Sequence, residues 1–410
     1  MRTGFAAAYG REPEGAWFAP GRVNLMGGPD YTEGFVLPFA LGAGVTAAAA
    51  RRSDRRLALV SRQQREPVLL DLDTLQPGSV RGWAAYPAGV AWALRQAGGQ
   101  VGGADLAIDA DLPAGAGLSS SAALECATAL ALAELYHLPL ARTELAASAR
   151  RAEHEFAGVP CGIMDQIAAL QSRAGQALLL DCRSGTGTPV PLDPAAAGLE
   201  LLIIDTRARR ALADGRYAER RRACEQAARA LGVRMLRDVH DAAALESLTD
   251  PSLRQISAHV LAEHRRVLNA AGLLRHGDPE ALGALLTESH HSLRDRFQVS
   301  WPQADQAVAA ALQAGAVGAR MTGGGFGGCV VALAPAERAT HVRAAVTDRF
   351  AQHRWPAPGY LAAVPSDGAR RIDPRGLFRR NEPLGVVHRP PADQRQHGLL
   401  GRQVVHRAVQ

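Results

Sequence analysis

The first sixty residues alternate short apolar runs with glycine and proline, a pattern typical of strands joined by turns. Longer apolar periods and further short runs follow. In the first half they predict helices at 83–97, 120–136, 142–156 and 162–172, and strands at 104–113 and 177–182. Residues 104–113 (ADLAIDADLP) alternate polar and apolar side chains, so we expect this strand to be buried on one face only.

The second half repeats this mixture of elements. The pattern predicts a strand at 199–206, helices across 214–314, a strand at 329–335 and a further helix after it. The stretch SGTGTPVPLDPAAAG at 184–198 is rich in turn residues and is the best boundary between two domains. Because both halves contain strands and helices, we predict two mixed domains, of α/β or α+β class, at 1–190 and 199–373.

Composition is typical of a soluble globular protein, since 47% of the 410 residues are hydrophobic and 21% are charged. The longest apolar run, at 35–50, is interrupted by proline and glycine and is too short to span a membrane. The five cysteines form no CxxC pair, so we expect neither a zinc site nor disulfides. We therefore expect a cytoplasmic protein without a membrane partner.

All 46 basic residues are arginine, and the chain contains no lysine. This excludes the usual P-loop NTPases, protein kinases and Schiff-base enzymes, because each of them needs a lysine amine. The Pro- and Arg-rich tail at 374–410 has seven arginines and two acids, and it carries +5 of the net charge of +6. The body is nearly neutral, so we expect no nucleic-acid partner and a disordered tail.

Two segments of the first half carry candidate chemistry. LPAGAGLSSSAALE at 112–125 places a glycine turn and three serines before a predicted helix, where free N–H groups bind anions without lysine. The same pattern is often only a helix cap. In AEHEFAGVPCGIMDQ at 152–166, Glu153 and Asp165 lie on two predicted helices joined by a glycine turn. Such carboxylates can face one site, toward a metal ion and a hydroxyl proton, or can be ordinary surface acids.

Two further segments lie near the ends of the chain. ARMTGGGFGGC at 319–329 has five glycines within six residues, which permits close approach to a ligand but also occurs in tight turns. GRVNLMGGPDYTEGFVLP at 21–38 places Arg22 before a loop that contains Asp30. An arginine there can neutralise phosphoryl charge, and a carboxylate can accept hydrogen bonds from sugar hydroxyls.

Together, the order and the amino-acid sequences of these segments resemble those of the GHMP family of small-molecule kinases and, within it, the galactokinase group. The resemblance rests on APGRVNLMG, DYTEGFVLP, LPAGAGLSSSAALE, CGIMDQ and MTGGGFGGC, and it covers residues from about 5 to 373. It implies an α+β kinase with an N-terminal domain of the ribosomal-protein-S5 type and a ferredoxin-like C-terminal domain. ATP would bind at their interface.

The resemblance also implies roles for individual residues. Asp165 would be the catalytic base, and Arg22 would stabilise the transferred phosphoryl group and orient Asp165. Ser121 and Glu153 would bind Mg²⁺. The sugar would contact Gly28, Pro29, Asp30, Gly162 and Tyr217. ATP would contact Ser61, Gly115, Ala116, Gly117, Leu118, Ser119, Ser120 and Ser121.

The implied reaction transfers the γ-phosphate of ATP to the anomeric hydroxyl of α-D-galactose, the first step of galactose catabolism, in a monomeric enzyme. One segment departs from the family pattern. GEHTDYN is replaced by the shorter Gly27-Gly28-Pro29-Asp30-Tyr31-Thr32, which lacks the Glu-His pair that binds sugar hydroxyls in the family. The loss of these groups predicts weaker galactose binding or a changed specificity.

Three other functions remain open at this point. The shortened loop would suit a kinase for another sugar. A related protein could also bind sugar and ATP as a sensor without turnover, in which we would expect a damaged ATP motif or catalytic base. Glu153, Asp165 and Arg22 are all present, which favours an enzyme over a sensor. An RNA-binding role has only the arginine-rich tail in support, without interleaved aromatic residues.

Overall fold

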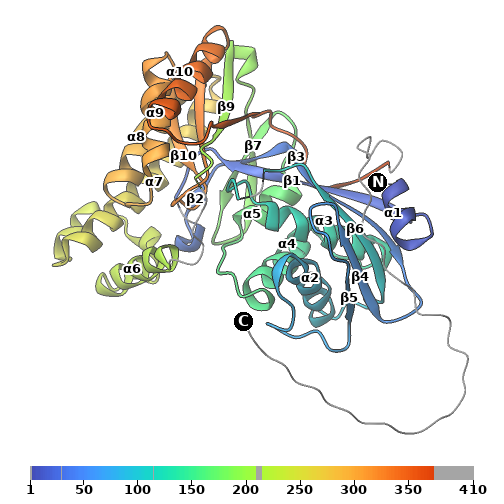
Figure 1. Cartoon of the computed structure of the whole chain (residues 1–410). Coiled ribbons are helices and arrows are strands. Elements are labelled where there is room, and N and C mark those ends of the chain that lie inside the picture. The colour runs from blue at the N-terminus through green and yellow to red at the C-terminus, as the bar shows by residue number, and fades with distance from the viewer. Residues whose placement is uncertain (1, 29, 114, 209–214, 374–410) are drawn as a thin grey trace, which may run out of the picture.

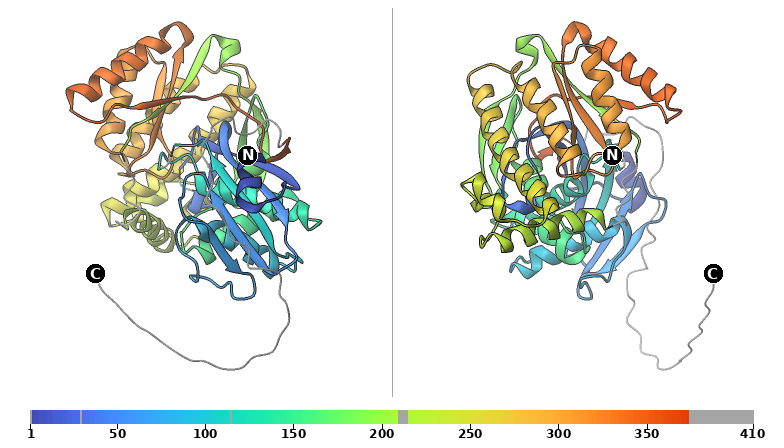
Figure 2. Two further views of the ribbon diagram at one scale, coloured as in Figure 1. Left: turned by 45° about the vertical axis from the view of Figure 1, so that its right-hand side comes forward. Right: turned by 90° about the vertical axis from the view of Figure 1, so that its left-hand side faces the viewer.

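The computed structural model describes residues 2–28, 30–113, 115–208 and 215–373 (Figure 1). Pro29, which we expect to contact the sugar, and the tail at 374–410, which we expect to be disordered, lie outside these residues. The described chain forms an N-terminal and a C-terminal part, each with its own sheet and helices (Figures 1 and 2). No helix in these ranges is both long enough and apolar enough to cross a membrane.

A six-stranded sheet forms the centre of the N-terminal part. Its order is β13, β1, β3, β6, β4, β5, and all neighbours are antiparallel except β4 and β6. The strands are β1 (Gly15–Asn24), β3 (Pro38–Arg51), β4 (Arg56–Ser61), β5 (Val68–Asp71), β6 (Ala104–Ala110) and β13 (Arg370–Ile372). One face carries α2 (Ala85–Gln96), α3 (Ser120–Leu135), α4 (Arg142–Arg151) and α5 (Met164–Gln171), and the opposite face is covered by α1 (Arg2–Tyr9).

The strand predicted at 104–113 is confirmed over Ala104–Ala110, but its predicted one-sided burial is wrong. The reason is α1, which packs on the second face of the sheet around Ala107. Asp105 is fully buried, and its carboxylate receives hydrogen bonds of 2.6 Å from both Arg11 and Arg52. A polar residue in an alternating pattern can therefore lie inside the protein when arginines neutralise it.

A four-stranded antiparallel sheet forms the C-terminal part, in the order β10, β11, β9, β12. Its strands are β9 (Leu199–Asp205), β10 (Gly318–Thr322), β11 (Cys329–Pro335) and β12 (Gly359–Ala362). The helices of this part are α6 (Arg216–Ala230), α7 (Pro251–Arg275), α8 (Leu282–Asp295), α9 (Pro302–Gln313) and α10 (Ala339–Gln352). Figure 1 shows α8, α9 and α10 beside this sheet, with α6 and α7 below it.

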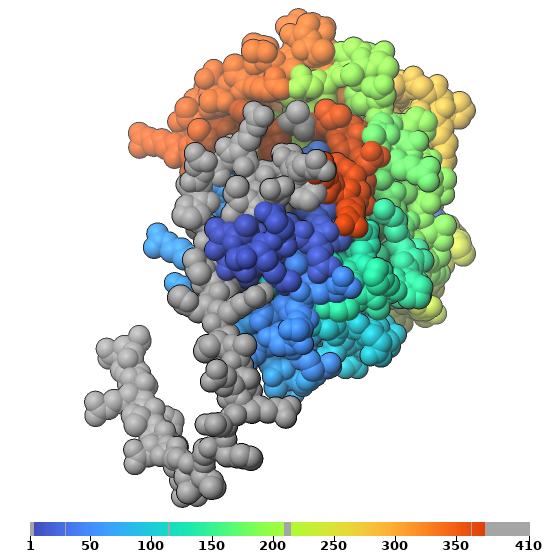
Figure 3. Space-filling view, turned by 90° about the vertical axis from the view of Figure 1, so that its right-hand side faces the viewer, coloured from blue at the N-terminus to red at the C-terminus, as the bar shows by residue number. Residues whose placement is uncertain are grey.

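A small sheet of β2 (Phe35–Val36), β7 (Gln176–Asp181) and β8 (Thr186–Pro191) lies between the two parts. The boundary expected at 184–198 therefore contains a strand, since β8 pairs with β7 along its whole length. After β12 the chain returns to pair as β13 with β1. Figure 3 shows this red segment next to the dark blue N-terminal segment. One buried cluster includes side chains from both β1 and β9, so the two parts share a core.

The helices predicted in the first half are found as α2 to α5, and the strands predicted at 177–182, 199–206 and 329–335 are β7, β9 and β11. One detail differs. The helix predicted at 142–156 changes at residue 152 into a π-helical turn, Ala152–Phe156. This turn contains Glu153, and π-helical turns inside helices are frequent at functional sites.

Candidate active site

The serine-rich segment forms a turn that leads directly into α3. Gly115 and Gly117 have φ angles of +74° and +75°, which favour glycine, and Ser119 at the start of the helix is also left-handed, with φ +59°. The Ser119 side chain forms no cap to the helix. Ala116 and Leu118 are buried and fix the turn to the core. The first turn of α3 therefore receives no side-chain cap from Ser119, and N–H groups at such a helix start are suited to binding an anion.

The glycine-rich segment of the C-terminal part reaches this turn. A Cβ on Gly328 would lie 3.1 Å from the Ala116 carbonyl oxygen, and a Cβ on Gly325 would lie 2.6 Å from Val299. Only glycine allows these backbones to approach so closely without displacement. The two glycine segments, more than 200 positions apart in sequence, thus meet at one place.

Arg22 and Asp165 form a two-pronged ion pair beside the same turn. Arg22 Nε donates to Asp165 Oδ1 at 2.8 Å, and Nη2 donates to Oδ2 at 3.0 Å. Arg22 Nη1 donates to the Gly117 carbonyl oxygen at 2.8 Å, and the Ser119 hydroxyl donates to Asp165 Oδ2. The guanidinium is almost completely buried, so the carboxylate is held in one orientation at the start of α5.

Glu153 lies close to Ser121 and behind Asp165. It is 6% exposed, and burial together with the Asp165 charge raises its pKa to about 7, against hydrogen bonds from Ser121, Cys161 and Gln166 that lower it. A cation at this point would favour the ionised carboxylate. The described residues contain no group of three His, Cys, Asp or Glu side chains that could hold a metal ion by themselves.

Two residues to which the sequence assigned no role complete this cluster. Gln166 Nε2 donates to Glu153 Oε2 at 2.8 Å and to Glu125 Oε2 at 3.1 Å, so one amide joins two buried carboxyl groups. Burial and the neighbouring Glu153 raise the pKa of Glu125 well above its ordinary value. Glu125 follows Ser121 by four positions on α3, so helical spacing alone could have placed it on the same face.

Asp30 and Gly162 face each other directly. A Cβ on Gly162 would lie 2.0 Å from the Asp30 carboxyl carbon, so no other residue fits there. The Asp30 carboxylate accepts a hydrogen bond from Met164 N at 3.1 Å. Burial, and then the charge of Asp165, raise the pKa of Asp30 to about 6. Asp30 is therefore tied to the backbone that also presents Asp165.

The remaining residues that the sequence predicted at the sugar and at the nucleotide lie on α6, beside α7 and at the end of β4. Tyr217 begins α6 and packs edge-on against Tyr31, with ring centroids 5.3 Å apart. Gly28 lies over α7, where a Cβ would be 3.7 Å from Glu263 and 3.8 Å from His259. Ser61, expected near the nucleotide, ends β4, and its hydroxyl exchanges hydrogen bonds with Gln63.

The start of the shortened loop at 27–34 is held by the C-terminal part. Arg320 Nη1 donates to the Leu25 carbonyl oxygen at 3.0 Å, and Nη2 donates to the Gly27 carbonyl oxygen at 3.2 Å. Glu263 Oε1 accepts from Gly27 N at 3.2 Å and from Ser289 Oγ at 2.6 Å. Both charged side chains are buried, 3.7 Å apart. Because the sequence separates these partners by more than 200 residues, no local pattern indicated the contact.

This arrangement suits phosphoryl transfer to a hydroxyl group. The serine-rich turn lies beside a carboxylate that is fixed by arginine and serine. A second carboxylate lies beside a serine hydroxyl, and the acidic residue of the loop at 27–34 is bonded to the start of α5. Phosphoryl transfer depends mainly on such positioning and on charge stabilisation, without covalent chemistry by the protein.

Three family models match the chain. They are the GHMP kinases N terminal domain at residues 85–173, the GHMP kinases C terminal at 270–352, and the galactokinase galactose-binding signature at 3–51. The signature match spans the shortened loop at 27–34, and the two domain matches cover the turn before α5 and the glycine-rich strand pair.

Curated relatives and solved structures agree with these matches. A galactokinase of Streptomyces coelicolor is 49% identical over 374 residues, which cover 90% of this chain and 97% of that protein. One of Mycobacterium tuberculosis is 44% identical over 353 residues, covering 83% and 97%. The crystal structure of Lactococcus lactis galactokinase complexed with galactose is similar at a TM-score of 0.86 with 29% identity, covering 90% and 98% of the two chains. This chain therefore belongs to the galactokinase group of the GHMP kinase family.

Proposed function

We propose that this chain is a galactokinase, which transfers the γ-phosphate of ATP to the anomeric hydroxyl of α-D-galactose and forms α-D-galactose 1-phosphate. The observation that carries the proposal is the Arg22–Asp165 ion pair beside the serine-rich turn. The names of the relatives support galactose and do not favour a kinase for another sugar or a sensor without turnover. The intact ion pair also supports turnover.

Asp165 and Arg22 are the catalytic residues in this proposal. Asp165 receives or directs the proton of the attacking hydroxyl, because both of its oxygens are already oriented by Arg22 and Ser119. Arg22 offsets the charge that develops on the transferred group. The segment Gly115-Ala116-Gly117-Leu118-Ser119-Ser120-Ser121 wraps the triphosphate with its N–H groups. Ser61, at the end of β4, is assigned a contact with the nucleotide.

Sugar binding is assigned to Asp30, Gly162, Tyr217 and the loop residues Gly28 and Pro29. Asp30 supplies a carboxylate that accepts hydrogen bonds from hydroxyl groups, and Gly162 leaves room for that carboxylate. We further propose two domains at 1–190 and 199–373, in a monomer of a reducing compartment such as the cytoplasm. The five cysteines, all present as free thiols, support the last point.

Ser121 and Glu153 fit a magnesium ion. Both are oxygen donors, as Mg²⁺ prefers, and the Ser121 hydroxyl already contacts the buried Glu153 carboxylate. A bound ion would supply charge stabilisation on the phosphate oxygens of ATP. Two protein ligands are sufficient, because Mg²⁺ usually keeps several waters and binds substrate phosphates.

The test is ATP-dependent phosphorylation of galactose by the purified chain. The reaction is monitored through the release of ADP and through phosphorus NMR of the sugar phosphate. Asp165→Asn should keep ATP binding and lose at least roughly 100-fold in kcat, since a positioned acid-base group contributes about that much. Asp348→Asn is the matched control, because this exposed acid of α10 lies outside every motif. Near-wild-type turnover by Asp165→Asn would remove Asp165 from the mechanism. No turnover of galactose by the wild type would remove the proposed function.

A further inference from the structure

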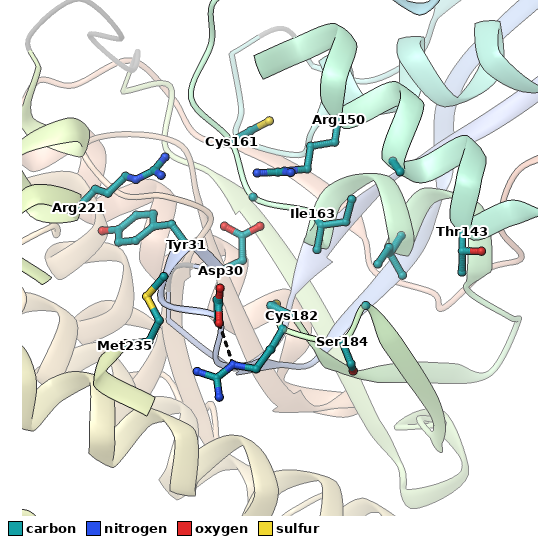
Figure 4. Close-up of a pocket in the computed structure, with 16 residues that line it drawn as sticks. Asp30, Tyr31, Thr143, Arg150, Cys161, Ile163, Cys182, Ser184, Arg221 and Met235 are labelled. Carbon is teal, nitrogen blue, oxygen red and sulfur yellow. Dashed lines mark hydrogen bonds and ion pairs between the residues drawn. The ribbon is translucent and has the colours of Figure 1, made fainter. Parts of the chain in front are cut away.

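A cavity of about 450 Å³ opens beside the sugar residues (Figure 4). Asp30 and Gly162 form part of its wall, together with side chains from α4, α5, α6 and the turn after β7. Neither Arg22 nor Asp165 belongs to the wall. The cavity therefore extends from the sugar-binding residues in a direction away from the phosphoryl-transfer pair. Its size is at the small end of ligand pockets and suits a monosaccharide with some water.

Arg150, near the end of α4, points into this cavity. Figure 4 shows its guanidinium extending from α4 between Cys161 and Ile163 toward Asp30. The two charges are near enough for Arg150 to lower the pKa of Asp30 against the effect of burial. A donor group and an acceptor group thus converge on one side of the cavity.

The other arginines of the cavity wall have acidic partners. Arg183 pairs with Glu33 at 2.7 Å, and Arg221 pairs with Glu225 at 3.0 Å. For Arg150, the described residues offer no ion pair, and its buried Nε has no hydrogen-bond partner among them. A guanidinium has only donor groups, so its unmet capacity must be filled by an oxygen acceptor from water or from a ligand.

A sugar hydroxyl fits between these two groups. It can donate its hydrogen to the Asp30 carboxylate and accept a hydrogen bond from Arg150 through its oxygen. The neighbouring loop offers little competition, because Gly27 and Gly28 have no side chains with which to bind a hydroxyl. A charged donor on a helix is also held more firmly than one on a loop, which favours discrimination between hydroxyl positions.

We propose that Arg150 is a sugar-binding residue, which donates a hydrogen bond to a hydroxyl of the hexose that Asp30 also contacts and so sets specificity at that position. The inference rests on the proposed function and names a residue of the same site. Its ligand class is a neutral hexose with a hydroxyl at the end away from the transferred phosphate.

The experiment compares Arg150→Met and Arg150→Lys with wild type. Arg151→Met is the matched control, since Arg151 is the next residue but pairs with Glu155 on the outer side of the helix. At saturating ATP, Arg150→Met should raise KM for galactose roughly 10- to 100-fold, the loss expected for a hydrogen bond to a charged group. The values of kcat and of KM for ATP should stay within about twofold, and Arg150→Lys should lie in between. Arg151→Met should behave as wild type.

Monodeoxygalactoses then separate binding from a structural effect. Wild type should lose affinity for the analogue that lacks the contacted hydroxyl. Arg150→Met should show a smaller penalty for that analogue, because only the Asp30 contact with the hydroxyl is then left to lose. An unchanged KM for galactose in Arg150→Met, or an equal penalty for galactose and every analogue, would overturn the proposal. If Arg150→Met does not fold, Arg150→Lys decides by the same comparison. These outcomes presuppose an active wild type, so they are distinct from failure of the proposed function itself.

Discussion

Glu263→Ala should both destabilise the protein and weaken sugar binding. The Glu263 carboxylate is completely buried between the two parts of the chain and lies 3.7 Å from the buried Arg320 guanidinium. It also accepts the hydrogen bond from Gly27 N at the start of the sugar loop. Arg266 Nε donates to the same carboxylate at 2.8 Å. The alanine variant therefore leaves the buried Arg320 with only carbonyl partners, Arg266 without its carboxylate, and Gly27 N without its acceptor.

Two arguments give similar magnitudes for the loss in the free energy of unfolding. Breaking a buried ion pair from one side costs about 3–5 kcal/mol. Independently, burial raises the pKa of Glu263, but Arg320, His259 and Arg266 together outweigh it and lower the value to about 2. Relative to an ordinary value of 4.5, this corresponds to about 3 kcal/mol of stabilisation at neutral pH. A loss of this size leaves a protein of typical stability folded at 25 °C.

Urea unfolding is the assay for stability, and galactose kinetics is the assay for the loop. With a slope of about 3 kcal/mol per molar urea, the midpoint should fall by about 1 M or more. KM for galactose should rise several-fold while KM for ATP stays constant, because Gly27 leads into the loop that carries Asp30, the proposed sugar ligand. Glu288→Ala, at an exposed position of the adjacent helix α8, is the control. With the same slope, a midpoint difference of about 0.3 M corresponds to a free-energy difference of roughly 1 kcal/mol. If the midpoint of Glu263→Ala lies within that distance of the control, the reasoning is refuted.

Two further predictions follow from the same geometry. Because the folded-state pKa of Glu263 lies below its ordinary value, its contribution is present above about pH 4.5 and is lost as the pH falls toward 2. The stability difference between wild type and Glu263→Gln should accordingly shrink over that interval, and a constant difference between pH 5 and 2 would contradict the assignment. Gly162→Ala places a methyl group 2.0 Å from the Asp30 carboxyl carbon. The value of kcat/KM for galactose should therefore fall far more than the affinity for ATP, which isothermal titration measures. Equal losses of both would argue against a sugar-specific role.

The order of strands and helices was predictable because it depends on local periodicity. Residues 329–335 form a strand with the predicted bounds, since an uninterrupted apolar run between glycines and a helix has few alternatives. Burial of β6 was not predictable in the same way. Asp105 lies inside because Arg11, just after α1, and Arg52, just after β3, both reach it. The π-helical turn at Glu153 and the return of the chain as β13 also depend on tertiary contacts.

The residues of the candidate site likewise fall into those that local sequence predicted and those that only tertiary contacts reveal. Arg22 and Asp165 were identified by motifs, and the structure places them in contact across 143 positions of sequence. Gln166, which joins Glu125 to Glu153, lies inside a recognised motif, but its side-chain partners belong to other helices. The local sequence around Arg320 and Glu263 is equally consistent with an ordinary strand residue and an ordinary helix residue, so it gave no sign of their contact. Partners that meet only after folding leave no local pattern.

The shortened loop changes which elements can recognise the sugar. Gly28 has room for a Cβ beside α7, but Glu263 and His259 lie directly beyond it. A long side chain there would therefore meet the residues around the buried ion pair. With glycines at 27 and 28, the loop instead contributes its backbone to the interdomain contact. In the proposed site, recognition depends on groups fixed by helices: Asp30, whose carboxylate accepts a hydrogen bond from the N–H at the start of α5, and Arg150 on α4. A site built on helices keeps its geometry more tightly than one built on a loop. Loss of loop side chains is therefore compatible with a selective sugar kinase, provided that the helix-borne charges bind the hydroxyls.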